Sequence, residues 1–159
     1  MAVEAEVKQV FAGLLQSCNT LQLATLSVAN EPEASYAPYL YEDGSYYIFV
    51  SELASHTQNL IHNPQASIML IESEADARNP FARKRFSAQC LVVETNREAE
   101  NYEPILDQLE QCFGSTIGML RTLPDFHLFE LQPQQGRLVI GFGKAFELDV
   151  DQLGQLIRN

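Results

Sequence analysis

The residues best suited to bind a charged ligand cluster between positions 78 and 89. The chain has 10 Lys and Arg residues against 21 Asp and Glu, for a net charge of −11. Even so, Arg78, Arg83, Lys84 and Arg85 fall within one short segment. A local positive site on a negative background favours a specific small anion, such as a phosphate or a carboxylate, over a polyanion.

Arg85 is the best placed of these cations because it begins an expected strand. Its alternate neighbours Ser87 and Gln89 then point to the same side of the sheet. That row offers guanidinium, hydroxyl and amide groups to one ligand. The alternative is a solvated loop in which the cations balance Glu72 and Glu74, and exposed ion pairs of that kind contribute little.

A second candidate group lies in the segment 51–60, SELASHTQNL, at an expected turn from a strand into a short helix. Ser55 or Thr57 is expected to cap that helix. The helix amides and the hydroxyl groups of Ser51 and Ser55 can bind a phosphate. The imidazole of His56 can ligate a metal or donate a hydrogen bond to the same ligand. The alternative for His56 is a surface histidine in a strand–helix turn.

The other two histidines are weaker candidates. We expect His62 to be exposed at the end of the short helix. His127 alternates with Asp125 on a short strand, which places both on one face, either as a hydrogen-bonded pair at a site or, as we favour, as a surface pair. No Ser/His/Asp or Cys/His arrangement has support from spacing, so covalent hydrolysis is not indicated.

Tyrosines are dense on one expected hairpin, at positions 36, 39, 41, 46 and 47. Such rings can stack on a planar cofactor. Packing inside a barrel or at a dimer face is the more common role, and we favour it for most of them.

These groups need elements to position them, and the hydrophobic periodicity predicts mostly strands. The expected strands are 21–28, 34–41, 45–50, 66–71, 85–94, and a hairpin of 126–131 and 137–142 around Pro133–Gly136. The expected helices are one near the N-terminus, 55–61, 98–113, 115–121, and a terminal helix that begins at Asp149 or Asp151 and ends at Asn159. The pattern has no βαβ repeat and predicts a mainly β (α+β) protein, a closed antiparallel barrel with peripheral helices.

Composition limits the class of protein. The length of 159 residues fits a single domain over 1–159. The acidic balance argues against nucleic acid and anionic lipid as partners, and no apolar run reaches the length of a membrane span. The three cysteines, Cys18, Cys90 and Cys112, lie too far apart for a disulfide framework or a zinc motif. We therefore expect a reducing, cytoplasmic setting.

Several local strings, in their order and spacing, resemble the pyridoxamine-phosphate-oxidase-like split barrels. Within that superfamily they are most similar to the heme-utilisation branch, the HugZ-like proteins. The strings are LATLSV at 23–28, ASYAPY at 34–39, SELASHTQNL at 51–60, EADARNPFARKRFS at 74–87, PDFHLFEL at 124–131 and GFGKAF at 141–146.

The resemblance implies a split β-barrel of about six to seven antiparallel strands that binds a cofactor as a homodimer. In the flavin-dependent members a Ser-Arg-Lys string grips the FMN phosphate. The matching residues here are Ser55, His56 and Thr57, and His-Thr is the common form in the heme-utilisation branch. The implied cofactor is therefore FMN or heme, with His56 as the candidate metal ligand.

Members of the heme-utilisation branch bind heme between subunits and can degrade it. The polar atoms of the row Arg85, Ser87 and Gln89 suit the edges of a flavin ring, or a propionate in the case of Arg85. Asp125 matches an acidic residue that supports an axial histidine in a short C-terminal tail. The last residues here, QLGQLIRN, contain no histidine.

Three functions follow from the resemblance. The first is a heme-utilisation protein that binds heme and degrades it in the manner of a heme oxygenase. The second is an FMN-dependent oxidoreductase, and the third is a non-catalytic carrier of heme or flavin. The expected partners are a second copy of the chain and the small-molecule ligand, with no nucleic acid and no membrane.

Overall fold

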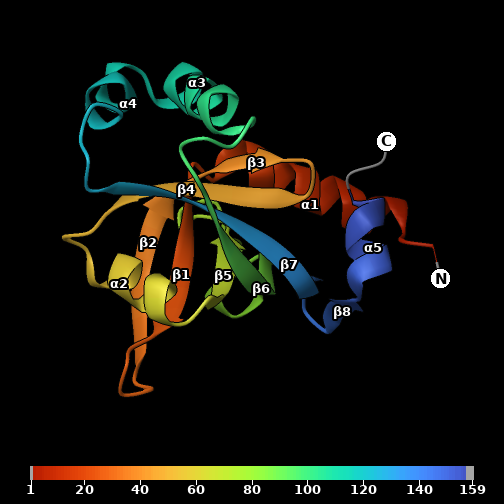
Figure 1. Ribbon diagram of the computed structural model, residues 1–159. Coiled ribbons are helices and arrows are strands. Elements are labelled where there is room, and N and C mark those ends of the chain that lie inside the picture. The colour runs from red at the N-terminus through yellow and green to blue at the C-terminus, as the bar shows by residue number, and fades with distance from the viewer. Residues whose placement is uncertain (1, 157–159) are drawn as a thin grey trace.

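The computed structural model describes residues 2–156, and an antiparallel sheet of eight strands forms its centre (Figure 1). The strands are β1 (Thr20–Leu26), β2 (Pro32–Pro38), β3 (Leu40–Glu42), β4 (Ser45–Ser51), β5 (Gln65–Ile71), β6 (Arg85–Thr95), β7 (Phe126–Gly141) and β8 (Lys144–Leu148). The helices are α1 (Ala5–Ser17), α2 (Ser55–His62), α3 (Tyr102–Phe113), α4 (Ser115–Leu120) and α5 (Val150–Gln155), with a 3₁₀ turn η1 at Pro80–Ala82.

The strands follow the order β2-β1-β5-β6-β7-β4-β3, with β8 paired to β7. The sheet curls until β2 contacts β4, which closes a barrel. Along β1 and β5 every second residue is buried, so one face of each strand points into the core. The prediction of a mainly β split barrel with peripheral helices is confirmed. Within residues 2–156 the strands number eight rather than about seven. The expected strand 34–41 divides into β2 and β3, the expected strands 126–131 and 137–142 are one strand, and β8 was not expected.

The barrel is open along one seam. Strands β1 and β5 pair only where Gln22–Ala24 meets Ser67–Met69, and they diverge beyond that point. A cavity of about 650 Å³ occupies the opening, between the seam and α1. This divergence is what splits the barrel.

The expected hairpin at 126–142 is wrong, because the segment forms one continuous strand, β7, of 16 residues. Strand β6 pairs with β7 along its whole length, and a bulge at Gln89/Cys90 absorbs an extra residue of β7. Pro133 lies opposite this bulge. A proline without an N–H group is tolerated in a central strand at such an irregularity. The Pro-Gln-Gln-Gly sequence therefore bends a strand and does not reverse the chain.

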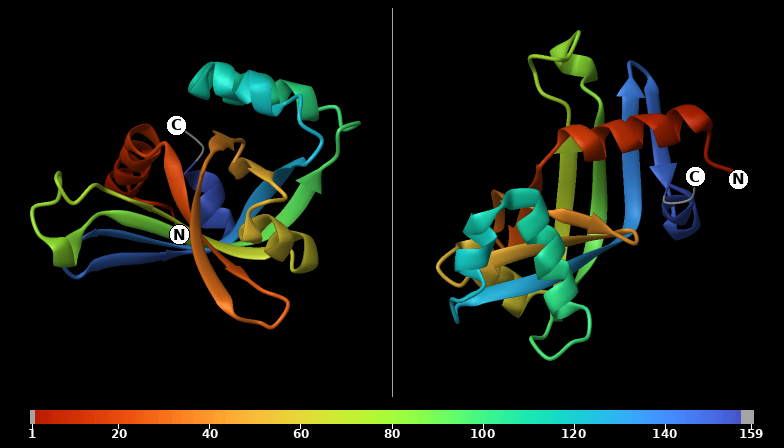
Figure 2. Two further views of the ribbon diagram at one scale, coloured as in Figure 1. Left: turned by 90° about the vertical axis from the view of Figure 1, so that its left-hand side faces the viewer. Right: turned by 90° about the horizontal axis from the view of Figure 1, so that it is seen from above.

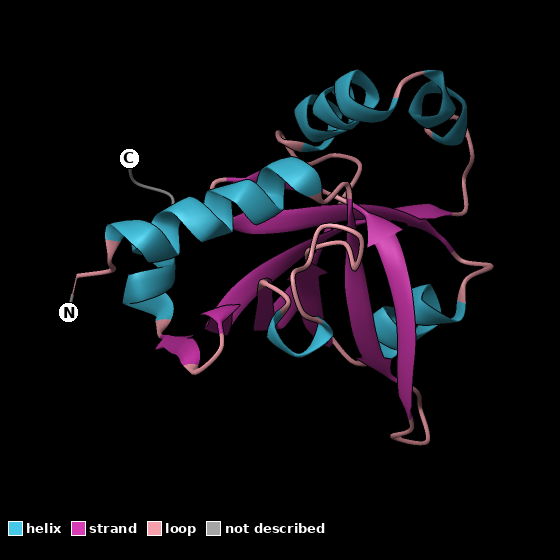
Figure 3. Ribbon diagram, turned by 180° about the vertical axis from the view of Figure 1, so that it is seen from behind, coloured by secondary structure: helices cyan, strands magenta, loops and turns pink. Residues whose placement is uncertain are grey.

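Helices cover the barrel on several sides. Helix α1 runs across β5, β6 and β7 (Figures 2 and 3) and buries Val7, Phe11 and Leu14 in the main core. Helices α3 and α4 form a second apolar cluster over β3, β4 and β7. Helix α2 packs against β1. The core and its helices thus fix the positions of the β4–α2 junction and of β6.

The start of α3 differs from the predicted one, whereas the start of α5 agrees with the prediction. Helix α3 begins at Tyr102 and not at position 98, after a turn, with Pro104 in its first turn where a proline is tolerated. Asp149 caps α5 in a capping box with Gln152, as expected of a start at that residue. Helix α5 ends at Gln155, and the predicted end at Asn159 lies outside the described residues.

Candidate functional site

Hydrogen bonds fix the junction between β4 and α2. The Ser51 hydroxyl donates to Oδ2 of Asp125 at 2.8 Å, and the Leu53 amide donates to the same hydroxyl at 3.1 Å. The Glu52 amide donates to the Asp125 carbonyl at 2.9 Å. Two residues that the sequence placed separately in the site, Ser51 and Asp125, are therefore direct partners. The Asp125 carboxylate orients this loop.

Helix α2 begins without a side-chain cap. Its N-cap residue is Ala54, so the prediction that Ser55 or Thr57 caps the helix is wrong. Ser55 is exposed. First-turn amides have no acceptor inside their own helix, and within residues 2–156 no other group accepts from those of Ser55 and His56. These two amides can donate to an anion.

His56 is half-buried, and its ring is held from one side. Nδ1 lies 2.8 Å from the Ser35 hydroxyl on β2. Burial lowers the pKa of His56 below 6.5, although the nearby Glu33 carboxylate opposes this effect. The imidazole is thus neutral at pH 7, which is the form that ligates metals. With Nδ1 engaged by Ser35, Nε2 is the ring nitrogen left for a ligand.

Thr57 does not fit the predicted role of ligand contact. Its side chain is fully buried, with 0% of its surface exposed. Its amide donates to the Ala54 carbonyl at 3.1 Å, and its hydroxyl has no partner among the described residues. Thr57 lies on the same inward face of α2 as Leu60, and that face packs on the barrel. Its side chain lies in the interior of the described chain, and a ligand contact by Thr57 stays a prediction.

The expected row on β6 is present. Arg85, Ser87 and Gln89 alternate with the buried residues Phe86 and Ala88, so the three polar side chains share the outer face. Within the basic cluster, Arg85 and Arg83 have different partners. Nη1 of Arg85 donates to the Arg83 carbonyl at 2.9 Å. The guanidinium of Arg83 donates to the Glu72 carbonyl and lies 3.8 Å from the Glu74 carboxylate, as expected of a loop that balances its own charge.

A pocket of about 250 Å³ lies beside this row, next to the bulge of β7. Ser87 and Gln89 line it from β6, and Gln135 and Arg137 line it from β7. Gln135 and Arg137 were not predicted as site residues, because Gln135 was expected in a turn and Arg137 in a separate returning strand. The bulge breaks the alternation of buried and exposed residues between Leu131 and Gly136, so no local signal marked Gln135 as part of a strand.

The predicted site residues therefore form two groups. Ser51, Asp125, Ser55 and His56 surround the start of α2, whereas Arg85, Ser87 and Gln89 lie on the outer face of β6. Within residues 2–156 no hydrogen bond or ion pair joins the two groups. We call these the α2 group (Ser51, Ser55, His56 and Asp125) and the β6 row (Arg85, Ser87 and Gln89).

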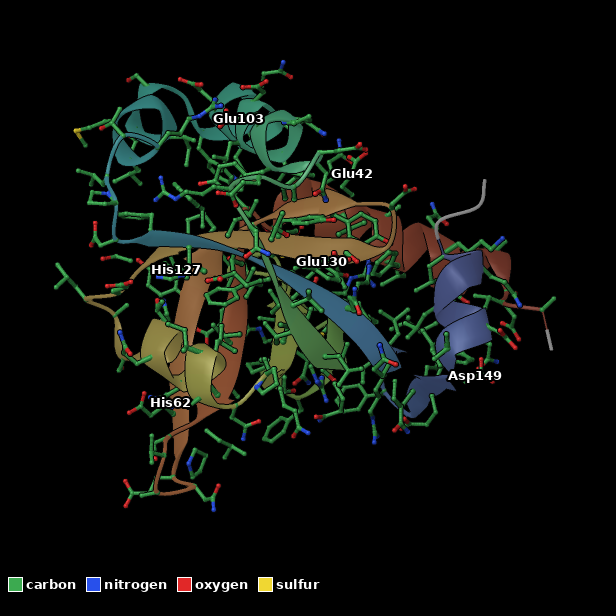
Figure 4. All side chains as sticks on the ribbon, viewed as in Figure 1. Glu42, His62, Glu103, His127, Glu130 and Asp149 are labelled. Atoms are coloured by element: carbon green, nitrogen blue, oxygen red, sulfur yellow. The ribbon has the colours of Figure 1, made fainter. Side chains whose placement is uncertain are left out.

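His127 and Asp125 do not form a hydrogen-bonded pair, which was the less favoured of the two alternatives. His127 bonds through Nε2 to Glu52 at 2.6 Å and through Nδ1 to Glu94. Burial lowers the pKa of His127, but the hydrogen bonds and charges of Glu52 and Glu94 outweigh it and raise the pKa above 6.5. His127 on β7 lies apart from His62, which is exposed at the end of α2 as predicted (Figure 4). With both ring nitrogens engaged, His127 has none left for a ligand.

Most of the tyrosines pack in the interior. Tyr39, Tyr46 and Tyr47 are buried and Tyr41 packs against the core, as the packing interpretation predicted. Tyr36 is the exception, since 66% of its surface is exposed on the outer face of β2.

Residues 7–140 match the sequence profile of the pyridoxamine 5'-phosphate oxidase family. The chain belongs to that family. It is 40% identical over 151 residues to heme oxygenase HutZ of Vibrio cholerae serotype O1. The aligned region covers 95% of this chain and 84% of HutZ.

Two solved structures are similar in sequence and in fold. A crystal structure of HutZ from Vibrio cholerae, described as a heme storage protein, has a TM-score of 0.79 and 37% identity, covering 91% of this chain and 100% of that one. The crystal structure of ChuZ from Campylobacter jejuni has a TM-score of 0.84 and 31% identity, covering 96% of this chain and 63% of that one.

The donor set decides which ligands fit. Within residues 2–156 no cluster of three or more His, Cys, Asp or Glu residues has the arrangement of a metal site. One neutral imidazole, one row of guanidinium, hydroxyl and amide groups, and two free amides suit a planar cofactor with acidic groups.

No helix of the described chain is long and apolar enough to cross a membrane.

Proposed function

We propose that this protein binds heme between two copies of the chain and acts in heme utilisation, as an oxygenase or as a store. The observation that carries the proposal is the 40% identity to heme oxygenase HutZ, which extends over 95% of the chain. The relatives' own descriptions divide between an oxygenase and a storage protein, so the two roles are tested separately below.

The chain's own residues fit this ligand. Heme supplies the iron at which oxygen is activated, and the protein has to bind, orient and shield it. Arg85 on β6 would pair with a heme carboxylate, and Ser87 and Gln89 would donate hydrogen bonds beside it. His56 would ligate the iron through Nε2, since Ser35 holds its other ring nitrogen. Asp125 would act indirectly, by holding the β4–α2 loop through Ser51.

A homodimer would bring together the α2 group of one chain and the β6 row of the other. Next to the row on β6, the outward-facing residues of β1 and β5 carry no charge; they are Thr20, Gln22, Ala24, Gln65, Ser67, Met69 and Ile71. Farther along β6 the same face continues with Leu91 and Val93, each 47% exposed. An uncharged sheet face with exposed apolar side chains is typical of a surface that another subunit covers. The cleft between the copies would then bring the α2 group of one chain to the β6 row of the other.

The cellular setting belongs to the same proposal. Cys18, Cys90 and Cys112 are all free, which fits the reducing cytoplasm.

The first test is a pair of titrations, with hemin and with FMN, followed by visible absorption. We expect a sharpened Soret band that saturates at one heme per chain, and no retained flavin after desalting. The variant His56→Ala should lose at least about tenfold in hemin affinity because it removes the iron ligand. The matched variant His62→Ala, on the same helix, should bind as the wild type does. Absence of any saturable hemin binding would refute the proposal.

Two further measurements separate its parts. Light scattering at micromolar concentration should report a dimer, and a monomer that still binds hemin would exclude the interface site. Incubation of the hemin complex with ascorbate and oxygen distinguishes the roles. Loss of the Soret band with release of iron to a ferrous chelator indicates an oxygenase, whereas a stable complex indicates a store or carrier.

The second candidate is an FMN-dependent oxidoreductase. It is favoured by the family match over residues 7–140 and by the two free amides at the start of α2. The replacement of the family's Arg-Lys pair by His56 and Thr57, of which Thr57 is buried, removes the charge that grips the phosphate. Flavin that survives desalting, with no saturable hemin binding, would establish this candidate instead.

A further inference from the structure

A second arginine lies next to the Arg85 row. Ser87 on β6 pairs directly with Arg137 on β7, and Arg85 pairs with Val139. Paired residues of antiparallel strands share a face, so Arg85 and Arg137 are diagonal neighbours on the outer face, roughly 7–8 Å apart at Cα. The continuous strand β7 is what places Arg137 here.

Arg137 borders a surface pocket that has polar side chains in its lining. Arg137 lines the pocket of about 250 Å³ together with Ser87, Gln89 and Gln135. These neighbours supply one hydroxyl and two amides, all capable of donating to a carboxylate. The inner side of this part of β7 is closed, because Leu153 and Phe86 lie against Gly136. The side chains at the pocket therefore face outward.

The guanidinium of Arg137 is held only loosely. Its Nη1 lies 3.2 Å from Oε1 of Glu147 on β8, and the side chains are 57% and 61% exposed. An exposed ion pair of this kind contributes little to stability, so a ligand carboxylate can replace Glu147 as the partner. On a chain of net charge −11, two arginines on one otherwise nearly uncharged sheet face indicate an acidic ligand.

We infer that Arg137 binds a carboxylate of the ligand beside Arg85, so that the site selects a planar ligand with two acidic groups. Glu147 competes with the ligand for Arg137 and tunes the affinity. This inference rests on the proposed function, and it goes beyond it by assigning two residues, Arg137 and Glu147, that set the preference for free carboxylates.

The test compares hemin with hemin dimethyl ester, in which both propionates are neutral. Arg137→Gln should weaken hemin binding about tenfold, the value of a charged hydrogen bond, and should leave binding of the ester unchanged. Glu147→Gln should strengthen hemin binding about twofold or more, because it removes an exposed competing charge. Each affinity is measured by Soret titration of the full chain.

The control removes the same charge elsewhere. Arg97 is exposed and donates to the carbonyls of Leu123 and Pro124, so Arg97→Gln should leave both affinities unchanged. Equal losses in Arg137→Gln and Arg97→Gln would overturn the inference, since they would reflect net charge alone. Equal losses for hemin and for the ester would also overturn it. If the wild type binds hemin and Arg137→Gln binds it with the same affinity, the inference fails and the proposed function stands. If the wild type binds no hemin, both fail.

Discussion

Nδ1 of His56 on α2 and the hydroxyl of Ser35 on β2 lie 2.8 Å apart. The bond ties the start of the helix to the barrel and sets the orientation of the ring. Because burial keeps the imidazole neutral, the contact also decides which ring nitrogen faces a ligand.

Removing the Ser35 hydroxyl should weaken hemin binding without loss of the fold. Ser35→Ala frees Nδ1 of His56, and loss of a group that orients a metal ligand costs about tenfold or more in affinity. Soret titration measures this effect. Ser27→Ala is the matched control, because its hydroxyl accepts from the Glu31 amide in the turn of the same hairpin. Hemin affinities that agree between Ser35→Ala and wild type would exclude His56 as the ligand.

Replacing Thr57 should stabilise the protein. The Thr57 hydroxyl is buried without a partner among the described residues, and valine has nearly the same shape. Thr57→Val should raise the free energy of unfolding by about 1 kcal/mol, because an unsatisfied buried hydroxyl is costly. Urea denaturation gives the value.

Thr25 offers the matched comparison. It is also buried, but its hydroxyl accepts from Nδ2 of Asn59 at 3.0 Å. Thr25→Val should therefore lower the free energy of unfolding by about 1 kcal/mol. A loss of stability in Thr57→Val as large as that in Thr25→Val would show that the Thr57 hydroxyl has a partner after all.

His127 should make stability depend on pH. Its folded-state pKa lies above 6.5, so folding favours the protonated ring. The stabilisation is fully present below the unfolded value of about 6.5 and is lost as the pH rises through the folded-state pKa. Its size is about 1 kcal/mol or less, since Glu52 and Glu94 are 47% and 41% exposed.

The variant His127→Gln should remove this dependence. Urea denaturation between pH 5 and about 8 should show a smaller difference in unfolding free energy than in the wild type. The exposed His62 provides the control, and His62→Gln should keep the wild-type profile. Identical profiles in all three proteins would mean that the His127 bonds to Glu52 and Glu94 do not form in solution.

Gly136 should tolerate no side chain. A Cβ there would lie 2.8 Å from Cδ2 of Leu153 and 2.9 Å from Cε2 of Phe86. Gly136→Ala should lower the free energy of unfolding by about 1–3 kcal/mol through overpacking. Gly13 in α1 has open space around it, so Gly13→Ala should raise the value by about 0.5–1 kcal/mol. Thermal or urea unfolding of the two variants should shift in opposite directions.

The sequence by itself predicted the barrel and the shared face of one group of candidate residues. Period-two alternation in segments such as 85–94 specifies strands, because inward positions must be apolar and outward positions need not be. The shared face of Arg85, Ser87 and Gln89 follows from that period alone. The order of local strings predicted the family, which the comparisons confirm.

Only the tertiary structure decided the rest. The sequence Pro133–Gly136 is compatible with a turn or with a bulge. It forms a bulge because β6 pairs with β7 on both sides of it, and this pairing places Arg137 next to Ser87. The inward face of α2 depends on the barrel beneath it, so the burial of Thr57 could not be read from its neighbours in sequence. His127 finds its partners 33 and 75 residues away. Local sequence patterns predict which residues of a strand or helix are buried. Contacts between distant segments depend on the order in which the strands pair, which local patterns do not specify.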